Sequence, residues 1–215
     1  MAVLSKVQIG NMALSNLGAK ANIESFSEAS KEARAISLWY DHSRLATLED
    51  YNWSFAVKRA TLTSHSEGPP SGIWSYRYQY PADCVLARHL QNPEYVASSR
   101  TIWDVPQVLV EPDAIPYIIE MNSTGTEKTI LTDLNDAVLV YTFDQQNVIH
   151  FSRNFSTALS FMLAYFIAIP ITGRADLKDQ MAQYYSFHMR RAAARDGNEA
   201  IQRPPREAES IRARL

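Results

Sequence analysis

The sequence predicts an α+β protein: a helical bundle built from N- and C-terminal helices, with an inserted antiparallel β-rich domain and an extended C-terminal tail. Apolar residues recur with helical spacing at both ends of the chain, whereas the middle is rich in Tyr, Val, Ile and Thr and holds most of the ten prolines. A charged stretch with two adjacent prolines follows the last helical pattern. The predicted boundaries are 1–56 and 152–197 for the two parts of the bundle, 57–151 for the β-rich domain and 198–215 for the tail.

Two helices are expected in the N-terminal part. The first covers residues 3–17, and Gly18 follows where a left-handed C-terminal cap is expected. Ser25 and Glu28 have the spacing of a capping box, in which each side chain accepts a hydrogen bond from a free backbone amide at a helix start. A second helix is therefore expected to begin near these residues and to run to about Asp50.

Short strands are expected in the middle of the chain. Residues 73–80 alternate aromatic and polar side chains, which is the pattern of a half-buried strand, and Pro81 ends it. Residues 117–121, 129–131 and 138–143 have the composition of further strands and are separated by turn-forming residues. The sheet is expected to be antiparallel.

Two more helices are expected after the strands, the first from about Phe155. Residues 154–173 carry no charge, but Pro170 is expected to break the helix, which leaves it shorter than the roughly 20 residues of a membrane span. No membrane partner is therefore expected. A last helix is expected to end before Gly197, and His188 on its apolar stripe is interpreted as a packed side chain.

Charge is distributed unevenly along the chain. The net charge is −2, but residues 190–215 contain seven Arg against four acids and carry +3, so the rest of the chain, with 14 basic and 19 acidic residues, carries −5. This asymmetry disfavours nucleic-acid binding by the body and favours a docking role for the tail. Cys84 is the only cysteine, which excludes an intrachain disulfide, and it is interpreted as a small buried residue.

The sequence gives little sign of catalytic or metal chemistry. None of the five histidines has the helical spacing of paired ligands. Residues 123–129 resemble a phosphate loop, but Glu127 stands where a second glycine is needed, so a hairpin turn is the preferred interpretation. Asp133 and Asp136 fit a turn better than an acid–base pair, and Arg77 is the only cation among the aromatic residues of the first strand. No catalytic, cofactor-binding or metal-binding residue is predicted, and no enzyme activity is expected.

Several short runs occur in an order that resembles one known family. The most specific are Asn52–Ala56, which reads Asn-Trp-Ser-Phe-Ala, and Pro170–Gly173, which reads Pro-Ile-Thr-Gly. Other matching residues are Asn11, Ala13, Leu14, Leu17, Gly18, Tyr40, Asp41, Arg44, Arg59, Ala60, Leu62, Tyr80–Cys84, Ile130–Thr132, Leu163 and Ala164. Together they resemble the tail tubular protein A family, the head-to-tail adaptor (connector) proteins of tailed bacteriophages.

This resemblance implies a structural protein of the virion, located in the neck between capsid portal and tail and assembled in the host cytoplasm. It implies a ring of twelve subunits that binds the portal protein, lines the channel for double-stranded DNA during genome ejection, and contacts a downstream tail or nozzle protein. No cofactor is implied. From its charge, the tail is a candidate portal-docking segment; its candidate docking residues are Arg203, Arg206, Ile211, Arg212, Arg214 and Leu215.

Large or conformationally special residues in the two specific runs suggest an architectural junction. Trp53 and Phe55 lie where helix is expected to give way to strand, while Pro170 and Gly173 are expected to make the reversal between the last two helices. Two alternatives stay open. A virion-associated cell-wall hydrolase would need carboxylates or a Cys-His pair gathered in a cleft, and a nucleic-acid-binding module would need a basic patch on the folded body.

Overall fold

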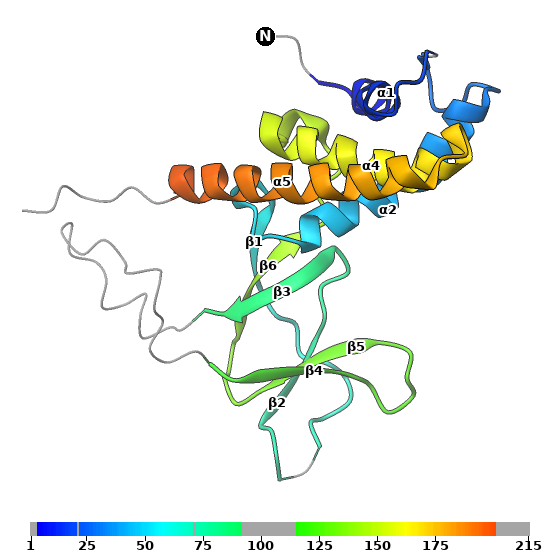
Figure 1. The fold of residues 1–215 in the computed structure, drawn as a ribbon. Helices are drawn as coiled ribbons and strands as arrows, with labels where there is room; N and C mark the ends of the chain where they lie inside the picture. Colours follow the sequence, from blue (N-terminus) through cyan, green and yellow to red (C-terminus); the bar gives the residue numbers. More distant parts are fainter. Residues whose placement is uncertain (1–3, 21, 71, 92–114, 201–215) are drawn as a thin grey trace, which may run out of the picture. The chain divides into compact units, whose positions relative to one another are not determined.

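The computed structural model describes residues 4–20, 22–70, 72–91 and 115–200 (Figure 1). Within them it has four α-helices and two small antiparallel sheets, which confirms the α+β class. The helices are α1 (Lys6–Asn16), α2 (Lys31–Glu49), α4 (Arg153–Thr172) and α5 (Ala175–Ala200). The strands are β1 (Val57–Thr61), β2 (Tyr76–Gln79), β3 (Cys84–Leu90), β4 (Tyr117–Met121), β5 (Lys128–Thr132) and β6 (Val138–Phe143). Short 3-10 turns occur at Ser54–Ala56 and Val148–His150.

The contacts within the chain define two compact units. Unit 1 consists of Met1–Lys58, Asp83–Leu86 and Thr142–Gly197, and unit 2 includes Arg59–Ala82 and Ala87–Tyr141. Unit 1 therefore takes α1 and α2 from one end of the chain and α4 and α5 from the other, as the blue and the yellow-to-orange helices of Figure 1 show. The predicted domain boundaries, and the arrangement of the helices as a bundle, stay predictions.

Helix α1 is closed by capping interactions at both ends. Ser5 and Gln8 form a reciprocal capping box at its start. At its end Gly18 has φ +70°, its amide donates to the carbonyl of Ser15, and the amide of Ala19 donates to the carbonyl of Leu14. These are the two hydrogen bonds of a Schellman motif, so the left-handed cap predicted at Gly18 is confirmed.

Helix α2 begins later than predicted. Its N-cap is Ser30, whose hydroxyl accepts from the amide of Ala33, and it ends at Glu49, close to the predicted end. The capping box predicted at Ser25 and Glu28 is wrong, because those residues form a turn instead. In that turn the Glu28 carboxylate accepts from a backbone amide four residues earlier, so the side chain closes a non-helical segment.

Helix α4 continues through Pro170, which corrects the predicted break. Proline lacks the amide that would bond one turn back, but in the last turn of a helix this loss is confined to one hydrogen bond. Gly173 then caps α4 with φ +70°, and its amide donates to the carbonyl of Ile169 at 2.9 Å. The reversal into α5 is therefore made at Gly173 and Arg174, and not at Pro170.

Among the described helices, α4 alone is long and apolar enough to cross a membrane by length and composition, and half of its most apolar stretch is buried. It packs against α1 and α2. A helix buried in the core of a soluble protein has the same composition.

Helix α5 is longer than predicted, since it continues past Gly197 to Ala200. Glycine in a helix costs about 1 kcal/mol relative to alanine, and here the adjoining Asp196 is held by a buried contact. Both oxygens of the Asp196 carboxylate accept from Ser54, one from its amide at 2.9 Å and one from its hydroxyl at 2.7 Å. The rest of the predicted tail, residues 201–215, lies outside the described residues.

The core of unit 1 lies between the helices. Its largest fully buried side chains come from α1, α2, α4 and the segment after α2, and are Trp53, Tyr40, Phe155, Ile9, Leu14, Ile36 and Leu48. Polar contacts join the ends of the chain, because Asn16 of α1 donates to the hydroxyl of Ser160 in α4 at 3.2 Å. Burial of these side chains is the main stabilising contribution, at about 25 cal/mol per Å² of apolar surface.

In unit 2, β5 lies between β2 and β4 in an antiparallel sheet, with Tyr78 opposite Ile130 and Ile119 opposite the same residue on the other side. The other sheet has the order β1-β6-β3. The strands predicted at 117–121, 129–131 and 138–143 are confirmed as β4, β5 and β6.

The strand predicted at 73–80 is only partly right, because β2 covers just Tyr76–Gln79. Gly72 has φ +84°, which interrupts extended backbone, and the backbone amide and hydroxyl of Ser75 both donate to Asp133 instead of to a neighbouring strand. Strands β1 and β3 lie in the region predicted to be β-rich but were not predicted individually.

Candidate functional site

Trp53 and Phe55 lie in unit 1 directly after α2 and before β1. Trp53 is fully buried, and its indole N–H donates to the carbonyl of Thr47 in the last turns of α2 at 2.8 Å. Its ring meets Phe55 and, edge to face, Phe155 of α4, with ring centroids 5.8 Å and 5.0 Å away. Through these contacts the segment between α2 and β1 packs against the helices of unit 1.

A buried arginine forms a second polar centre in unit 1. Arg44 of α2 is 2% exposed and donates to the carboxylates of Asp41 and Asp144 and, at 3.0 Å, to the carbonyl of Gln145. Burial raises the pKa of the Asp144 carboxyl, but hydrogen bonds from Arg44 and Gln146 and the charge of Arg44 outweigh it, so the pKa lies below its usual value. The charge of Arg44 is thus compensated inside the fold.

One buried hydroxyl in unit 1 has no hydrogen-bond partner among the described residues. It belongs to Tyr40 of α2, whose side chain is 2% exposed and whose ring meets Phe26 edge to face. Burial raises the pKa of Tyr40 to about 12, although the charge of Arg44 lowers it, and the charge of Asp41 adds a smaller increase. A hydroxyl with such a pKa stays protonated at neutral pH and does not act as a base.

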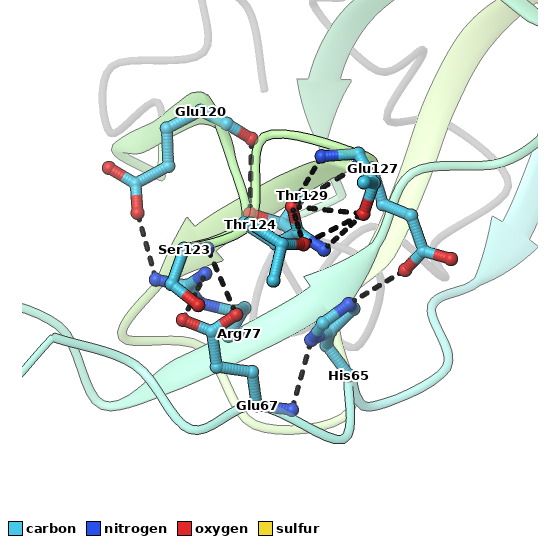
Figure 2. Close-up of polar contacts among 10 residues, drawn as sticks. His65, Glu67, Arg77, Glu120, Ser123, Thr124, Glu127 and Thr129 are labelled. Atoms are coloured by element: carbon cyan, nitrogen blue, oxygen red, sulfur yellow. Dashed lines mark hydrogen bonds and ion pairs between the residues drawn. The ribbon is translucent and has the colours of Figure 1, made fainter.

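The densest polar cluster of unit 2 surrounds Arg77 of β2 (Figure 2). The Arg77 side chain is 4% exposed and lies between two carboxylates. Its Nη2 donates to Glu120 of β4 at 2.9 Å, while Nη1 lies 3.2 Å from Glu67 without hydrogen-bond geometry. Glu67 also accepts from the amide of Ser123, which is the main reason why its pKa is lowered. This cluster joins the segment before β2 to the β4–β5 hairpin.

His65 fixes the same hairpin from the other side (Figure 2). Its Nδ1 accepts from the amide of Glu67 at 3.0 Å, so the proton of the neutral ring is on Nε2, which lies 3.0 Å from the Glu127 carboxylate. At the hairpin tip, the side chain of Asn122 accepts from the amides of Thr126 and Glu127. The hairpin turn predicted for residues 123–129 is therefore confirmed.

The other residues considered for chemistry have structural surroundings. Asp133 accepts both hydrogen bonds from Ser75, and Asp136 occupies the turn with φ +51°. Cys84 in β3 is partly and not fully buried, which corrects the prediction of a buried side chain. His188 stacks on Phe161 with centroids 4.7 Å apart, and burial followed by the charge of Arg191 lowers its pKa. Within the described residues, no group of His, Cys, Asp and Glu side chains could hold a metal ion.

Two shallow depressions lie next to each other on unit 1. The larger, of about 620 Å³, opens between the segment before α2 and the first turns of that helix, and its walls include Phe26, Arg34 and Leu38. A second lies beside it at residues 22–28. Arg44, Arg77 and His65, which carry the strongest polar contacts, line neither depression.

A scan of the sequence against models of known protein families finds no match, and neither does a search of curated proteins. The resemblance to the tail tubular protein A family therefore rests on the short runs in the sequence. The function drawn from it is a proposal.

The seven arginines of residues 190–215 divide into two groups. Arg190, Arg191 and Arg195 lie on α5 within unit 1 and are exposed. The candidate docking residues, from Arg203 to Leu215, lie outside the described residues. A signal for this division was present in the sequence, since the apolar helical pattern of the last helix extends over the first three arginines.

Exposed apolar side chains occur on three helices of unit 1. Leu38 of α2 is 72% exposed, Ile169 of α4 is 48% exposed, and Phe187 of α5 is 60% exposed. Trp39, which follows Leu38 in α2 and is partly buried, stacks on Phe166 with ring centroids 4.7 Å apart. Single exposed apolar residues are ordinary, but aromatic and apolar groups gathered on helix faces are typical of interaction surfaces.

Proposed function

We propose that this protein is a structural component of a tailed bacteriophage virion, a head-to-tail adaptor of the tail tubular protein A kind. In this role it forms a ring, of twelve subunits by analogy with the family, between the portal and the tail and lines the channel for DNA. Its partners are the portal protein, further copies of itself and a downstream tail or nozzle protein. It acts by binding and not by catalysis.

The observation that carries the proposal is the structural position of the two most specific runs. Asn52–Ala56 lies directly after α2, and Pro170–Gly173 lies at the end of α4, both within unit 1. Each run contains a residue whose surroundings restrict the amino acid at that position. Trp53 is fully buried, and Gly173 has a left-handed backbone conformation. Runs that are required by the fold in this way support a shared architecture more strongly than matching apolar residues alone.

The exposed apolar residues of unit 1 support self-association. A ring requires two different surfaces on each subunit, because a contact repeated by rotation joins one face to another face of the next copy. Leu38 and Phe187 lie on different helices and are both more than half exposed, so unit 1 offers apolar positions on two elements for such contacts.

Portal binding is assigned to the C-terminal tail on the basis of its charge. The candidate residues are Arg203, Arg206, Ile211, Arg212, Arg214 and Leu215, which combine positive charge with two apolar side chains. Because α5 extends to Ala200, a truncation that tests the tail should remove residues 201–215 and keep the helix intact.

Mass photometry of the purified protein with portal rings from the same phage tests the proposal. The full chain is expected to add about twelve subunits to each portal ring, and the 201–215 truncation is expected to lose this association while its circular dichroism spectrum stays helical. A folded full chain that does not associate with the portal would overturn the adaptor function. Association by the truncated chain would overturn the role of the tail alone.

A further inference from the structure

The C-terminal half of α5 carries a local excess of positive charge. Residues 180–195 contain three arginines, Arg190, Arg191 and Arg195, and no Asp or Glu. All three are exposed, and none forms an ion pair or hydrogen bond with another described residue. Charged side chains left without partners on a rigid helix are available to a ligand of opposite charge.

Asp50, which follows α2, accepts a hydrogen bond from Tyr185 in this stretch, but no ion pair with the three arginines is formed by it or by the acids that follow them on α5. Asp196 is 6% exposed, and both of its carboxylate oxygens are taken by Ser54, so it faces the interior of unit 1. On α5, Asp176 and Asp179 precede the acid-free stretch, and Glu199 is the first exposed acid after it, one turn beyond Arg195. The acid-free stretch of sixteen residues corresponds to about 24 Å of helix at 1.5 Å per residue.

Aromatic side chains lie on the same helix face as two of the arginines. Tyr184, Phe187, Arg191 and Arg195 follow one another at intervals of three or four residues, which places them on one face. Tyr184 is 43% and Phe187 is 60% exposed. We call these four residues together with Arg190 the α5 stripe. His188 beside it is stacked on Phe161, and its lowered pKa leaves arginine as the source of charge at neutral pH.

We propose that the α5 stripe binds the phosphate backbone of a nucleic acid. Guanidinium groups form paired hydrogen bonds with phosphate oxygens, and three of them on one helix match a ligand with regularly repeated negative charge. Double-stranded and single-stranded DNA share this backbone, and the exposed aromatic rings can stack only on the bases of a single strand. The charge of −5 outside residues 190–215 disfavours nucleic-acid binding by the body as a whole, but the stripe is a basic region within the folded unit 1.

This inference goes beyond the adaptor function and does not depend on portal binding. In an adaptor ring, the stripe would be a point of direct contact with the DNA that passes through the channel. Outside such a ring, the same residues would bind DNA in the isolated subunit. The two proposals can therefore fail separately.

The test is the binding of the full chain to a fluorescently labelled short DNA duplex and to the matching single strand, measured by fluorescence anisotropy between about 50 and 200 mM salt. Three phosphate contacts are expected to give a slope of log K against log salt of about −2.7 for duplex and about −2.1 for single strand. The triple variant R190Q/R191Q/R195Q is expected to bind at least tenfold more weakly at low salt and to have a flatter slope.

The control variant K20Q/K31Q/R34Q removes the same charge from exposed positions outside the stripe. It is expected to bind DNA with nearly the affinity of the parent chain. Equal weakening in both variants, or unchanged binding by the stripe variant, would overturn the proposal, because binding would then follow net charge or another surface. Circular dichroism and thermal unfolding should be unchanged in the stripe variant, since the three side chains have no described partners.

Phe187→Ala distinguishes the two forms of DNA. Weakened binding of the single strand alone would support a stripe that stacks on bases, and unchanged binding of both forms would support duplex contact through the backbone. Portal association of the stripe variant should be measured in parallel. Lost portal association with DNA binding at the level of the parent chain would overturn this proposal, whereas lost DNA binding with portal association retained would support it.

Discussion

Arg44 and Asp144 are separated by 100 residues in the sequence and form an ion pair inside unit 1. The arginine side chain is 3% exposed and the aspartate side chain is 29% exposed, so the pair lies at the edge of the core. It connects α2 to the segment after β6, and the carbonyl of Gln145 accepts a second hydrogen bond from the same guanidinium nitrogen. If the carboxylate of Asp144 is removed, the buried guanidinium of Arg44 loses one of its two carboxylate partners.

Asp144→Asn is therefore expected to reduce the free energy of unfolding by about 2 kcal/mol, which is less than for a fully buried pair because the Asp144 side chain is partly exposed. The matched control is Asp41→Asn. It removes the other carboxylate bound to Arg44, but its side chain is 70% exposed, and about 0.5 kcal/mol or less is expected. Urea unfolding measures both variants. Equal stabilities would show that Asp144 is not the main partner of Arg44.

The same pair predicts a dependence of stability on pH. The pKa of Asp144 is lower in the folded than in the unfolded chain, where it is about 3.9. Its contribution is thus fully present above about pH 4 and is lost as the pH falls through the lower folded value. The difference in stability between the parent chain and Asp144→Asn should shrink between pH 7 and about pH 3. A difference that stays constant over this range would contradict the lowered pKa.

In unit 2, the two sides of the Arg77 cluster should respond unequally to mutation. The double variant E67Q/E120Q leaves a buried guanidinium without a carboxylate and should lower Tm by roughly 5 °C or more. Arg77→Met leaves two carboxylates that are each about a third exposed and can be hydrated, so a smaller loss is expected. Thermal unfolding followed by circular dichroism compares them. A larger loss in Arg77→Met would reverse the interpretation of the cluster.

Trp53→Phe tests the junction after α2. The substitution removes the hydrogen bond to Thr47 and part of a fully buried ring, with an expected loss of about 2 kcal/mol. Trp39→Phe is the control, because Trp39 is only partly buried and stacks on Phe166. It should cost less than about 1 kcal/mol. Urea unfolding with matched baselines distinguishes the two, and similar losses would argue against a special role of Trp53.

Gly173→Ala tests the reversal between α4 and α5. The open space around Gly173 accommodates a Cβ, but φ +70° is unfavourable for alanine by about 1 kcal/mol. Gly68→Ala is the matched control, since its surroundings are equally open and its φ is not in the left-handed region. Stability losses should appear in the first variant only. If the two variants unfold at the same urea concentration, the strain assigned to Gly173 is absent.

The fold was predicted correctly where an element depends on the conformational preferences of residues that are close together in the sequence. The C-terminal cap at Gly18 and strands β4, β5 and β6 were predicted because glycine and β-branched residues have strong local preferences. The start of α2 was predicted wrongly because Ser25 and Ser30 both have N-cap chemistry, and only the surrounding structure selects the second.

The polar centres could not be predicted because their partners are distant in sequence. Arg77 meets a glutamate 43 residues later, and nothing in the alternation of β2 distinguishes an inward arginine from an exposed one. Pro170 was predicted to end α4, although a proline in the last turn removes just one hydrogen bond. By contrast, the last helix was predicted to extend to residue 197, so the position of Arg190, Arg191 and Arg195 on α5 follows from the sequence, whereas their exposure does not.

The construction of unit 1 from both ends of the chain has a consequence during synthesis. The hydrogen bond between Asn16 and Ser160 joins residues 144 positions apart, and α1 and α2 find their apolar partner α4 only after the intervening strands have been translated. At about 5–20 residues per second, Ile9 and Ile36 stay without that partner for roughly 7 to 30 seconds after they leave the ribosome. Nascent chains of this protein should therefore be clients of ribosome-associated chaperones, and slower translation should increase aggregation.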